Sequence, residues 1–296
     1  MGKGKGGKKK AKADAERGSG TPFTDALRAR DGFVLAEWDT RGTPGFTGDK
    51  AAGHKALAAA DDEIDELQEQ LYAMGTAGSR KRLLLVIQGM DTSGKGGIMR
   101  HVVGSVDPQG VEITAFKKPT AEELAHPFLW RIRKALPGPG KIGVFDRSHY
   151  EDVLVVRVHD LVPRSQWSRR YTTINNFEQE LVEDGVTVIK VMLHISKEEQ
   201  GSRLRERLDR PDKYWKYNPG DVDERMHWEA YQEAYQVALD KTSTDVAPWY
   251  VVPADRKWYA RLAVQQLLLE HLRAMDLGWP EADFDIEVEK ERLAAS

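Results

Sequence analysis

The sequence predicts an α/β fold in which helices cover both faces of a five-stranded parallel sheet. Five short apolar or β-branched segments alternate with segments of helical periodicity, which is the pattern of parallel strands joined by crossover helices. A glycine-rich loop directly follows the first of these apolar segments, at a strand-to-helix junction. Because such crossovers are right-handed, the carboxyl ends of all the strands are expected at one edge of the sheet.

The elements follow one another along a single α/β domain that we expect to span 21–280, followed by a C-terminal tail at 281–296. Residues 21–53 are rich in Gly, Thr and Asp and are expected to form an irregular lead-in. The expected strands are 83–87, 111–116, 142–145, 187–195 and 249–252. The expected helices are 54–74, 95–105, 121–135, 165–184, 197–208, 221–240 and 256–275.

Composition narrows the class of protein. With 296 residues, 40% of them hydrophobic, the chain can bury the core of one large α/β domain. It has no apolar stretch near the roughly 20 residues of a membrane span and no signal-peptide pattern. The absence of cysteine excludes disulfides, thiolate metal sites and cysteine nucleophiles. We therefore expect a cytoplasmic protein without a membrane partner.

The net charge of −3 hides an asymmetry between the ends of the chain. Residues 1–20 contain seven Lys/Arg and two Asp/Glu, a net of +5, so the rest of the chain carries −8. This Gly/Lys/Ala-rich segment lacks apolar periodicity and is expected to be a disordered tail. It is either a solvated tail without function or an arm that attracts polyanions.

The loop after the first strand, Gly-Met-Asp-Thr-Ser-Gly-Lys-Gly-Gly at 89–97, matches the phosphate-binding pattern Gly-x4-Gly-Lys. Its backbone N–H groups and the helix start at Lys95 suit a bound phosphate. Two departures stand out. Gly96 replaces the Ser/Thr that ordinarily binds magnesium, and the acid Asp91 lies inside a loop that holds anions. A carboxylate there would repel phosphate unless a metal ion lay between them.

A second group of polar residues follows the strand at 142–145. An aspartate at the end of a buried strand, Asp146, is the arrangement that holds Mg²⁺ in many phosphoryl-transfer enzymes, although such a residue also serves as a helix cap. Asp91 and Asp146 together are expected to replace the missing hydroxyl as the metal anchor. Arg147 can bind phosphate with its planar fork. Glu151 and Asp152 either bind substrate or cap a helix through 153–158.

A third group is basic and lies within 200–222, which we name the lid segment. Arg203 and Arg207 are four residues apart and therefore share a helix face, and Lys213 and Lys216 follow a break at Pro211. Mobile basic segments of this kind close over phosphates in small kinases. The alternative is a solvated helix with ion pairs between neighbouring turns. The aromatic residues at 214, 215 and 217 either stack on a base or pack against the sheet.

Other candidates depend on position alone. Lys117 and Lys118 follow the second strand at the same edge, and Lys117 is a candidate phosphate ligand. Trp130 is expected in the core. The histidines form no His-x3-His pair, so no zinc site is predicted, and there is no Gly-x-Ser-x-Gly motif of a hydrolase.

Several motifs in order resemble the polyphosphate kinase 2 family over about residues 25–280. They are the loop at 89–97, Phe-Lys-Lys-Pro-Thr at 116–120, Phe-Leu-Trp-Arg at 128–131, Phe-Asp-Arg-Ser-His-Tyr-Glu-Asp-Val-Leu at 145–154, and the basic lid segment after Ser-Lys-Glu-Glu-Gln at 196–200. The resemblance implies a three-layer α/β/α phosphate-loop kinase-like fold with a helical lid. It also implies Mg²⁺-assisted transfer of a phosphoryl group between inorganic polyphosphate and AMP, ADP or ATP, with Mn²⁺ as a possible substitute.

The resemblance assigns roles by position. Asp91 and Asp146 hold the metal, and the catalytic set is Asp91, Lys95, Asp146, Arg147, Arg203 and Arg207. The substrate-binding set is Gly89, Thr92, Ser93, Gly94, Gly96, Gly97, Lys117, Glu151, Asp152, Arg157, Lys213 and Lys216. The family also implies a homo-oligomer, a dimer or tetramer, and no specific nucleic-acid partner.

Subclass is the open point within the resemblance. The Ser-His-Tyr-Glu-Asp form at 148–152 is most like members that use both AMP and ADP, in which the position of Glu151 is linked to AMP use. Some of those members have Asn where this chain has Asp146. Two other functions are compatible with the residues: an ATP-dependent kinase of a nucleotide or small metabolite, and a non-catalytic nucleotide-binding module. The phosphoryl donor distinguishes the first, and binding without turnover distinguishes the second.

Overall fold

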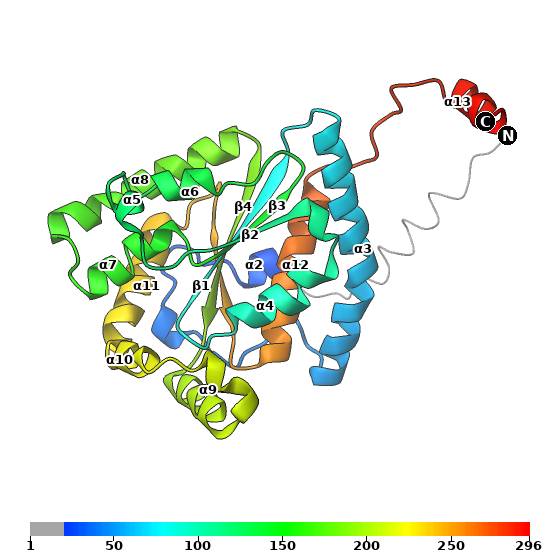
Figure 1. The fold of residues 1–296 in the computed structure, drawn as a ribbon. Helices are drawn as coiled ribbons and strands as arrows, with labels where there is room; N and C mark the ends of the chain where they lie inside the picture. The colour runs from blue at the N-terminus through cyan, green and yellow to red at the C-terminus, as the bar shows by residue number, and fades with distance from the viewer. Residues whose placement is uncertain (1–20) are drawn as a thin grey trace.

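The computed structural model describes residues 21–296, and the basic tail predicted at 1–20 lies outside the described residues. Five parallel strands form one sheet in the order β2-β3-β1-β4-β5 (Figure 1). The strands are β1 (Arg82–Gly89), β2 (Val111–Ala115), β3 (Ile142–Asp146), β4 (Val186–His194) and β5 (Trp249–Pro253). All five expected strands are confirmed, with ends that differ by at most two residues.

Helices cover both faces of the sheet, so the three-layer α/β/α fold is confirmed (Figure 1). One face carries α2 (Phe23–Ala26), α3 (Lys50–Thr76), α4 (Lys95–His101) and α12 (Lys257–Ala274). The other carries α5 (Ala121–Leu124), α6 (Trp130–Lys134), α7 (Val155–Val158), α8 (Arg164–Glu183) and α11 (Trp228–Thr242). The lid segment contains most of α9 (Lys197–Asp209) and the start of α10 (Gly220–Met226), beyond the carboxyl ends of the strands.

Short 3₁₀ turns complete the described elements: η1 (Leu35–Glu37), η2 (Val103–Ser105), η3 (Pro108–Gly110), η4 (His149–Asp152) and η5 (Pro211–Lys216). Three expected helices differ from those observed. The helix expected at 121–135 is two short helices, because Pro127 lacks the N–H that a continuous helix needs. The helix expected at 221–240 is interrupted at His227, and that expected at 95–105 ends at His101 before η2.

The core lies on both sides of the central strands, and every residue of β1 is buried. A close approach fixes the outer helices: a Cβ on Gly53 of α3 would lie 2.4 Å from the ring of Trp258 on α12. The lead-in, mostly irregular as expected, also protects a sheet edge. Leu27 and Ala29 exchange backbone hydrogen bonds of 2.8 Å with β5, so this edge strand is not left open.

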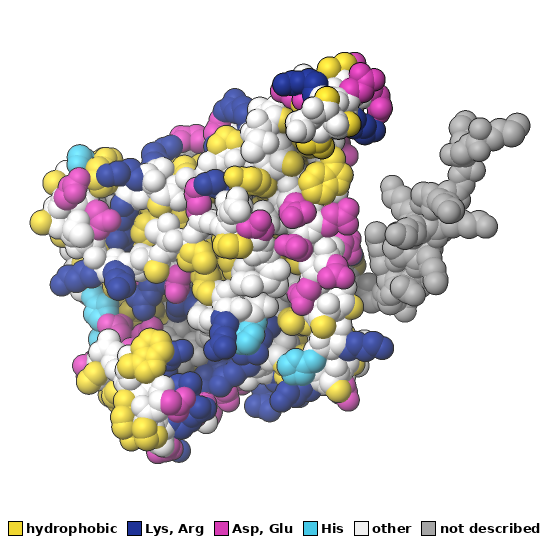
Figure 2. Space-filling model, turned by 45° about the vertical axis from the view of Figure 1, so that its right-hand side comes forward, with side chains coloured by type: hydrophobic (Ala, Val, Ile, Leu, Met, Phe, Trp, Pro, Cys, Tyr) yellow, Lys and Arg dark blue, Asp and Glu magenta, His cyan; other side chains and the backbone are white. Residues whose placement is uncertain are grey.

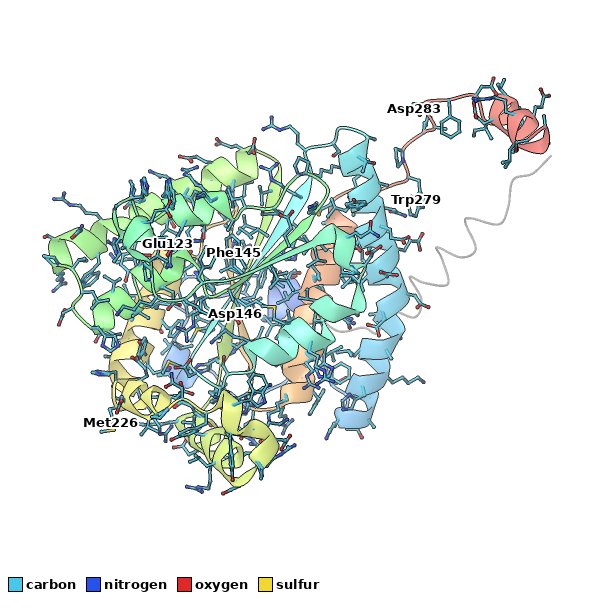
Figure 3. All side chains as sticks on the ribbon, viewed as in Figure 1. Glu123, Phe145, Asp146, Met226, Trp279 and Asp283 are labelled. Atoms are coloured by element: carbon cyan, nitrogen blue, oxygen red, sulfur yellow. The ribbon has the colours of Figure 1, made fainter. Side chains whose placement is uncertain are left out.

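The C-terminal tail leaves the body of the molecule. Trp279 and Asp283 lie on the connection to α13 (Ile286–Ala294), which stands away from the sheet (Figure 3). Within residues 21–296 there is no helix with the length and apolar character needed to cross a membrane.

Candidate active site

The loop at 89–97 joins β1 to α4 at the edge where the strands end, and its backbone has the shape expected of an anion cradle. Gly89 and Gly94 have φ angles of +152° and +116°, which side chains disfavour. A Cβ on Gly89 would also lie 2.7 Å from the carbonyl oxygen of Leu193. Lys95 begins α4 and its Nζ donates to the carbonyl of Gly89 at 2.8 Å. Burial, followed by the charge of Arg147, lowers the pKa of Lys95, so an added phosphate would favour its charged form.

A Ser or Thr side chain would have room at Gly96, so crowding does not explain why the hydroxyl is absent there. No atom lies within 4 Å of the place where its Cβ would stand. Elsewhere in the loop, Oγ1 of Thr92 and Oγ of Ser93 are buried without a hydrogen-bond partner in the described structure. Because buried polar atoms are rarely left unpaired, these two hydroxyls indicate a polar ligand that completes the loop.

Asp91 and Asp146 meet beside this loop. Asp146 ends β3, directly across from Ile87 of β1, and Figure 3 places it at the centre of the molecule. Arg147 follows with a φ angle of +64°, and its Nη2 donates to Oδ1 of Asp91 at 2.9 Å. Nη1 of the same guanidinium lies 3.7 Å from Oε2 of Glu151. The phosphate loop and the turn that follows β3 therefore converge at one point.

The donor set fits a magnesium ion shared with substrate. Oδ1 of Asp146 is buried and has no hydrogen-bond partner in the described structure, and the side chain of Asp91 is 24% exposed. Among residues 21–296 there is no group of three or more His, Cys, Asp or Glu able to enclose a metal ion. Mg²⁺ usually takes one or two carboxylates, several waters and the phosphates of its substrate, so two carboxylates are enough.

Glu151 lies in the site, where burial disfavours the ionised form of its carboxyl group. Burial raises its pKa, and Arg147 and Lys95 offset this shift only in part. Glu151 belongs to η4 and does not cap α7, whose N-cap residue is Leu154. The carboxylate is therefore a largely buried group close enough to both cations of the site for each to lower its pKa.

We expect Glu151→Gln to raise the melting temperature at pH 7.5, with a gain that shrinks as the pH falls toward 4.5. The folded pKa lies above the ordinary value, so the native state binds more protons between the two values and loses stability as the pH rises. Each kcal/mol corresponds to roughly 2–4 °C in a domain of this size. Thermal melts from pH 4.5 to 8 measure this, with exposed Glu122→Gln as control; an equal gain at every pH would contradict the expectation.

The lid arginines have different surroundings. Arg203 of α9 is buried, and all of its hydrogen bonds go to the protein, including the carbonyls of Thr92 and Ser93 in the loop. Arg207 is more exposed and donates from Nη1 to the carbonyl of Lys216 and to Asp221. In this structure Arg203 holds the loop, whereas Arg207 faces the open side of the site.

Three predicted binding residues lie away from this convergence. Lys117 follows β2, at the edge of the sheet; its side chain is exposed and its carbonyl accepts a bond from Arg131 at 2.9 Å. The carboxylate of Asp152 pairs with Arg170 at 2.8 Å. Arg157 pairs with a carboxylate of α11. In this structure the two charged pairs hold η4 and α7 against their neighbouring helices.

Two cavities open beside Asp91, and they share Asp91, Asn218 and Asp221 in their walls. The inner cavity, of about 270 Å³, is lined by Gly89, Met90, Asp91, Arg147, Glu151, Leu154, Val155, Asn218, Gly220, Asp221, Glu224, Tyr231 and Tyr235. The basic groove, of about 520 Å³, is lined by the loop, by Asp146, and by Arg100, His101, Arg203, Arg207, Lys213, Lys216, Lys257 and Arg261, among others. Figure 2 shows Lys and Arg side chains gathered in the lower part of the face that it views.

Sequence reasoning missed residues in both walls. Arg100, His101 and Arg261 lie close enough for the two arginines to add to the burial that lowers the pKa of His101. Gathered like charges of this kind favour an anion. Lys257 and Arg261 are four apart at the start of α12, a spacing that indicates a shared helix face but nothing about its neighbours. Tyr231 and Tyr235 are also four residues apart, but they belong to no sequence motif that indicates a site.

Comparisons with known proteins agree with this geometry. The family model described as Polyphosphate kinase 2 matches residues 47–278. The chain is 45% identical to an AMP/ADP-polyphosphate phosphotransferase of Meiothermus ruber, over 85% of this chain and 92% of that protein. It is 42% identical to an ADP-polyphosphate phosphotransferase of Rhodopseudomonas palustris, over 83% and 88% respectively. A crystal structure titled Polyphosphate Kinase 2, from Arthrobacter aurescens TC1, superimposes with a TM-score of 0.92 at 56% identity, over 94% of this chain and 98% of that one.

Proposed function

The chain belongs to the polyphosphate kinase 2 family, and we propose from its site how it transfers a phosphoryl group between inorganic polyphosphate and a nucleotide. The observation that carries the proposal is the pair of cavities that share Asp91. A phosphoryl transfer needs a donor and an acceptor in line on either side of the phosphorus. The two cavities supply one place for each.

The basic groove suits polyphosphate. Polyphosphate is a chain of negative charges without bases, so a run of Lys and Arg side chains is sufficient to bind it. The groove starts at the phosphate loop and continues to Arg100 and Arg261, which places a row of cations along the path of a chain. Binding by such cations is expected to weaken as salt is added.

The inner cavity suits the nucleotide. Beside its charged residues Arg147 and Glu151 it has an apolar part formed by Leu154, Val155 and tyrosines of α11. Mixed linings of this kind are typical of sites for small molecules with an apolar ring and polar ends. The relatives named for AMP/ADP and for ADP suggest that both nucleotides enter. Glu151, which lines this cavity, is our candidate for the residue that admits AMP.

Asp91 and Asp146 are the residues that would hold Mg²⁺, or Mn²⁺ in its place, as the buried and unpaired Oδ1 of Asp146 suggests. When bound there, the ion would neutralise charge on the phosphate oxygens. Arg147 is within reach of both the acidic loop residue and the inner cavity, so its second nitrogen is placed to contact a phosphate between the cavities. Lys95 and the loop amides support the phosphate on the groove side.

The transfer then needs no covalent enzyme intermediate. An oxygen of the nucleotide's terminal phosphate bonds to the terminal phosphorus of polyphosphate, and the bond from that phosphorus to the next bridging oxygen breaks. Polyphosphate leaves one unit shorter, and the nucleotide gains one phosphate. Asn218 and Asp221 of the lid segment line both cavities, which suits a lid that excludes water during transfer.

The identity of the phosphoryl donor distinguishes the proposed function from the two alternatives. Purified protein is incubated with Mg²⁺, polyphosphate and either AMP or ADP, without ATP, and the nucleotides are separated by chromatography. We expect ADP from AMP and ATP from ADP, and Lys95→Met, which removes the loop ammonium, is expected to reduce both about 100-fold. Turnover only when ATP replaces polyphosphate would indicate an ATP-dependent kinase, and binding without turnover a nucleotide-binding module.

A further inference from the structure

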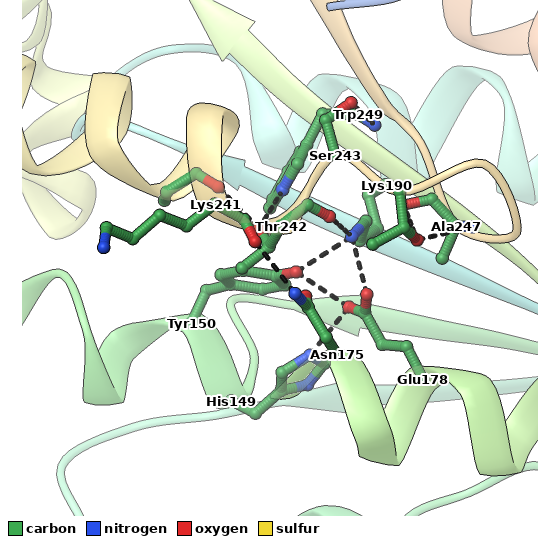
Figure 4. A network of polar contacts seen from close by, with 12 residues as sticks. His149, Tyr150, Asn175, Glu178, Lys190, Lys241, Thr242, Ser243, Ala247 and Trp249 are labelled. Carbon is green, nitrogen blue, oxygen red and sulfur yellow. Dashed lines mark hydrogen bonds and ion pairs between the residues drawn. The ribbon is translucent and has the colours of Figure 1, made fainter. Parts of the chain in front are cut away.

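A buried lysine that does not line the inner cavity contacts two of the elements that do. Lys190 is on the central strand β4, has no exposed surface and uses its ammonium for three hydrogen bonds. Nζ donates to Glu178 Oε2 at 2.6 Å, to the hydroxyl of Tyr150 at 2.9 Å and to the carbonyl of Thr242 at 2.6 Å (Figure 4). Three donors and three acceptors make a fully satisfied buried cation.

The first two contacts hold η4. Glu178 Oε1 accepts from the hydroxyl of Tyr150 at 2.8 Å and lies 3.2 Å from Nε2 of His149 (Figure 4). Both of these residues lie between Arg147 and Glu151, the two charged residues that the same turn places in the inner cavity. The backbone at Arg147 is in the left-handed region that non-glycine residues rarely adopt, so neighbouring contacts must hold it there.

The third contact holds α11. Thr242 is the last residue of this helix, and a cation at a helix carboxyl end is favourable. The indole of Trp249 also donates to the hydroxyl of Thr242, at 2.9 Å. Two turns and more toward its start, α11 carries Tyr231 and Tyr235, which form the wall of the inner cavity opposite η4. Lys190 thus touches the supports of both walls.

We propose that the Lys190–Glu178 pair is a positioning device that fixes η4 and α11 at one spacing and so sets the nucleotide site. The proposal rests on the assignment of the inner cavity to the nucleotide. A buried ion pair is a costly way to gain stability alone, because apolar residues of similar volume often stabilise a fold as well or better. The basic groove is lined by the phosphate loop, Asp146, α4, the lid segment and α12, and the pair makes no hydrogen bond to any of these, so we expect the device to act mainly on the nucleotide.

The decisive variant replaces both charges, Glu178→Leu with Lys190→Met, so that neither is left buried and alone. We expect a folded protein whose KM for AMP and ADP rises about tenfold while its KM for polyphosphate stays within about twofold. A tenfold rise corresponds to about 1.4 kcal/mol of lost binding free energy. If the pair were only structural, the melting temperature would fall and both KM values would stay or change together. That result would overturn the proposal.

Tyr150→Phe keeps the ion pair and removes the Tyr150 link to η4, while the contact of His149 with Glu178 remains. It is expected to raise the KM for nucleotide by a smaller factor, about threefold, in the same direction. Gln265→Leu is the matched control, since Gln265 is also buried and hydrogen-bonded, to Leu57 and Asp61, but lies between α12 and α3. It should lower stability without separating the two KM values.

ADP binding measured by calorimetry separates this proposal from the proposed function. If the unaltered protein binds ADP but polyphosphate does not serve as donor, the proposed reaction fails and the positioning role is still measured by the Kd for ADP. If the double variant and Tyr150→Phe bind ADP as tightly as the unaltered protein, the positioning role fails whatever the donor assay shows.

Discussion

Asp91→Asn is expected to lower turnover about 100-fold to 1,000-fold, the range seen when one preorganised electrostatic contact to a transition state is removed. The carboxylate stands inside the phosphate loop and binds the guanidinium of Arg147 at 2.9 Å. Asparagine has nearly the same shape but no charge, so it weakens both the metal anchor and the hold on Arg147. Because the side chain is partly exposed, the fold should remain intact.

Two substitutions of Asp146 distinguish the effect of losing a metal ligand from the effect of losing a charge. Asp146→Ala removes both oxygens and should reduce turnover as much as Asp91→Asn does. Asp146→Asn keeps one oxygen that can bind a hard cation, so a smaller loss is expected. A turnover that is lowest in Asp146→Ala, higher in Asp146→Asn and highest in the unaltered protein would therefore show that the unpaired buried oxygen acts as a metal ligand.

Mn²⁺ gives a readout that does not depend on turnover. Titration of Mn²⁺ in the presence of polyphosphate, followed by electron paramagnetic resonance, should show weaker binding in Asp91→Asn and Asp146→Ala. Asp62→Asn is the control, because this exposed acid of α3 lies outside both cavities. Near-normal turnover and unchanged Mn²⁺ affinity in both variants would exclude the metal role.

The strands and the edge at which they end could be predicted, because both depend on local patterns. Apolar runs identify the strands, and the rule of right-handed crossovers places their carboxyl ends together. That is why Asp91 and Asp146, 55 residues apart in the sequence, were expected to meet, and why the structure places them beside one loop. Their chemical roles remain predictions.

The order of the strands and the partners of each side chain were beyond local patterns. Lys117 was expected at the active edge, but β2 is separated from β1 by β3, and the exposed side chain lies outside both cavities. Arg100 and Arg261 belong to helices whose charges look like ordinary solvated faces in the sequence. Only the packing of α4 against α12 brings them to one groove.

Among the predicted site residues, Arg203 has the surroundings that differ most from those expected from the sequence. Arg203→Lys is expected to lower turnover nearly as much as Asp91→Asn does. An arginine side chain has five N–H donors. In this structure they make five hydrogen bonds, of 2.6 to 3.1 Å, to the residues Thr92, Ser93, Glu199, Ala254 and Asp255. None is left for a phosphate while the loop has this shape.

Lysine keeps the charge but not the fork, so the substitution tests geometry against charge. If Arg203 clamps the loop, Arg203→Lys should lower stability by about 3 kcal/mol, since it removes several hydrogen bonds from a buried charge. Amide hydrogen exchange across 91–97 should then quicken even without substrate, and turnover should fall about 100-fold because the loop is no longer preorganised. Hydrogen exchange followed by mass spectrometry measures the loop directly.

Arg207→Lys is the matched comparison on the same helix face. Arg207 is more exposed and makes both of its hydrogen bonds from Nη1, so its loss should raise the KM for polyphosphate and leave loop exchange unchanged. A phosphate contact by Arg203 would give that same pattern at Arg203, with stability and exchange preserved. The clamp therefore requires the two variants to differ, because one arginine shapes the cradle while the other faces the groove that polyphosphate enters.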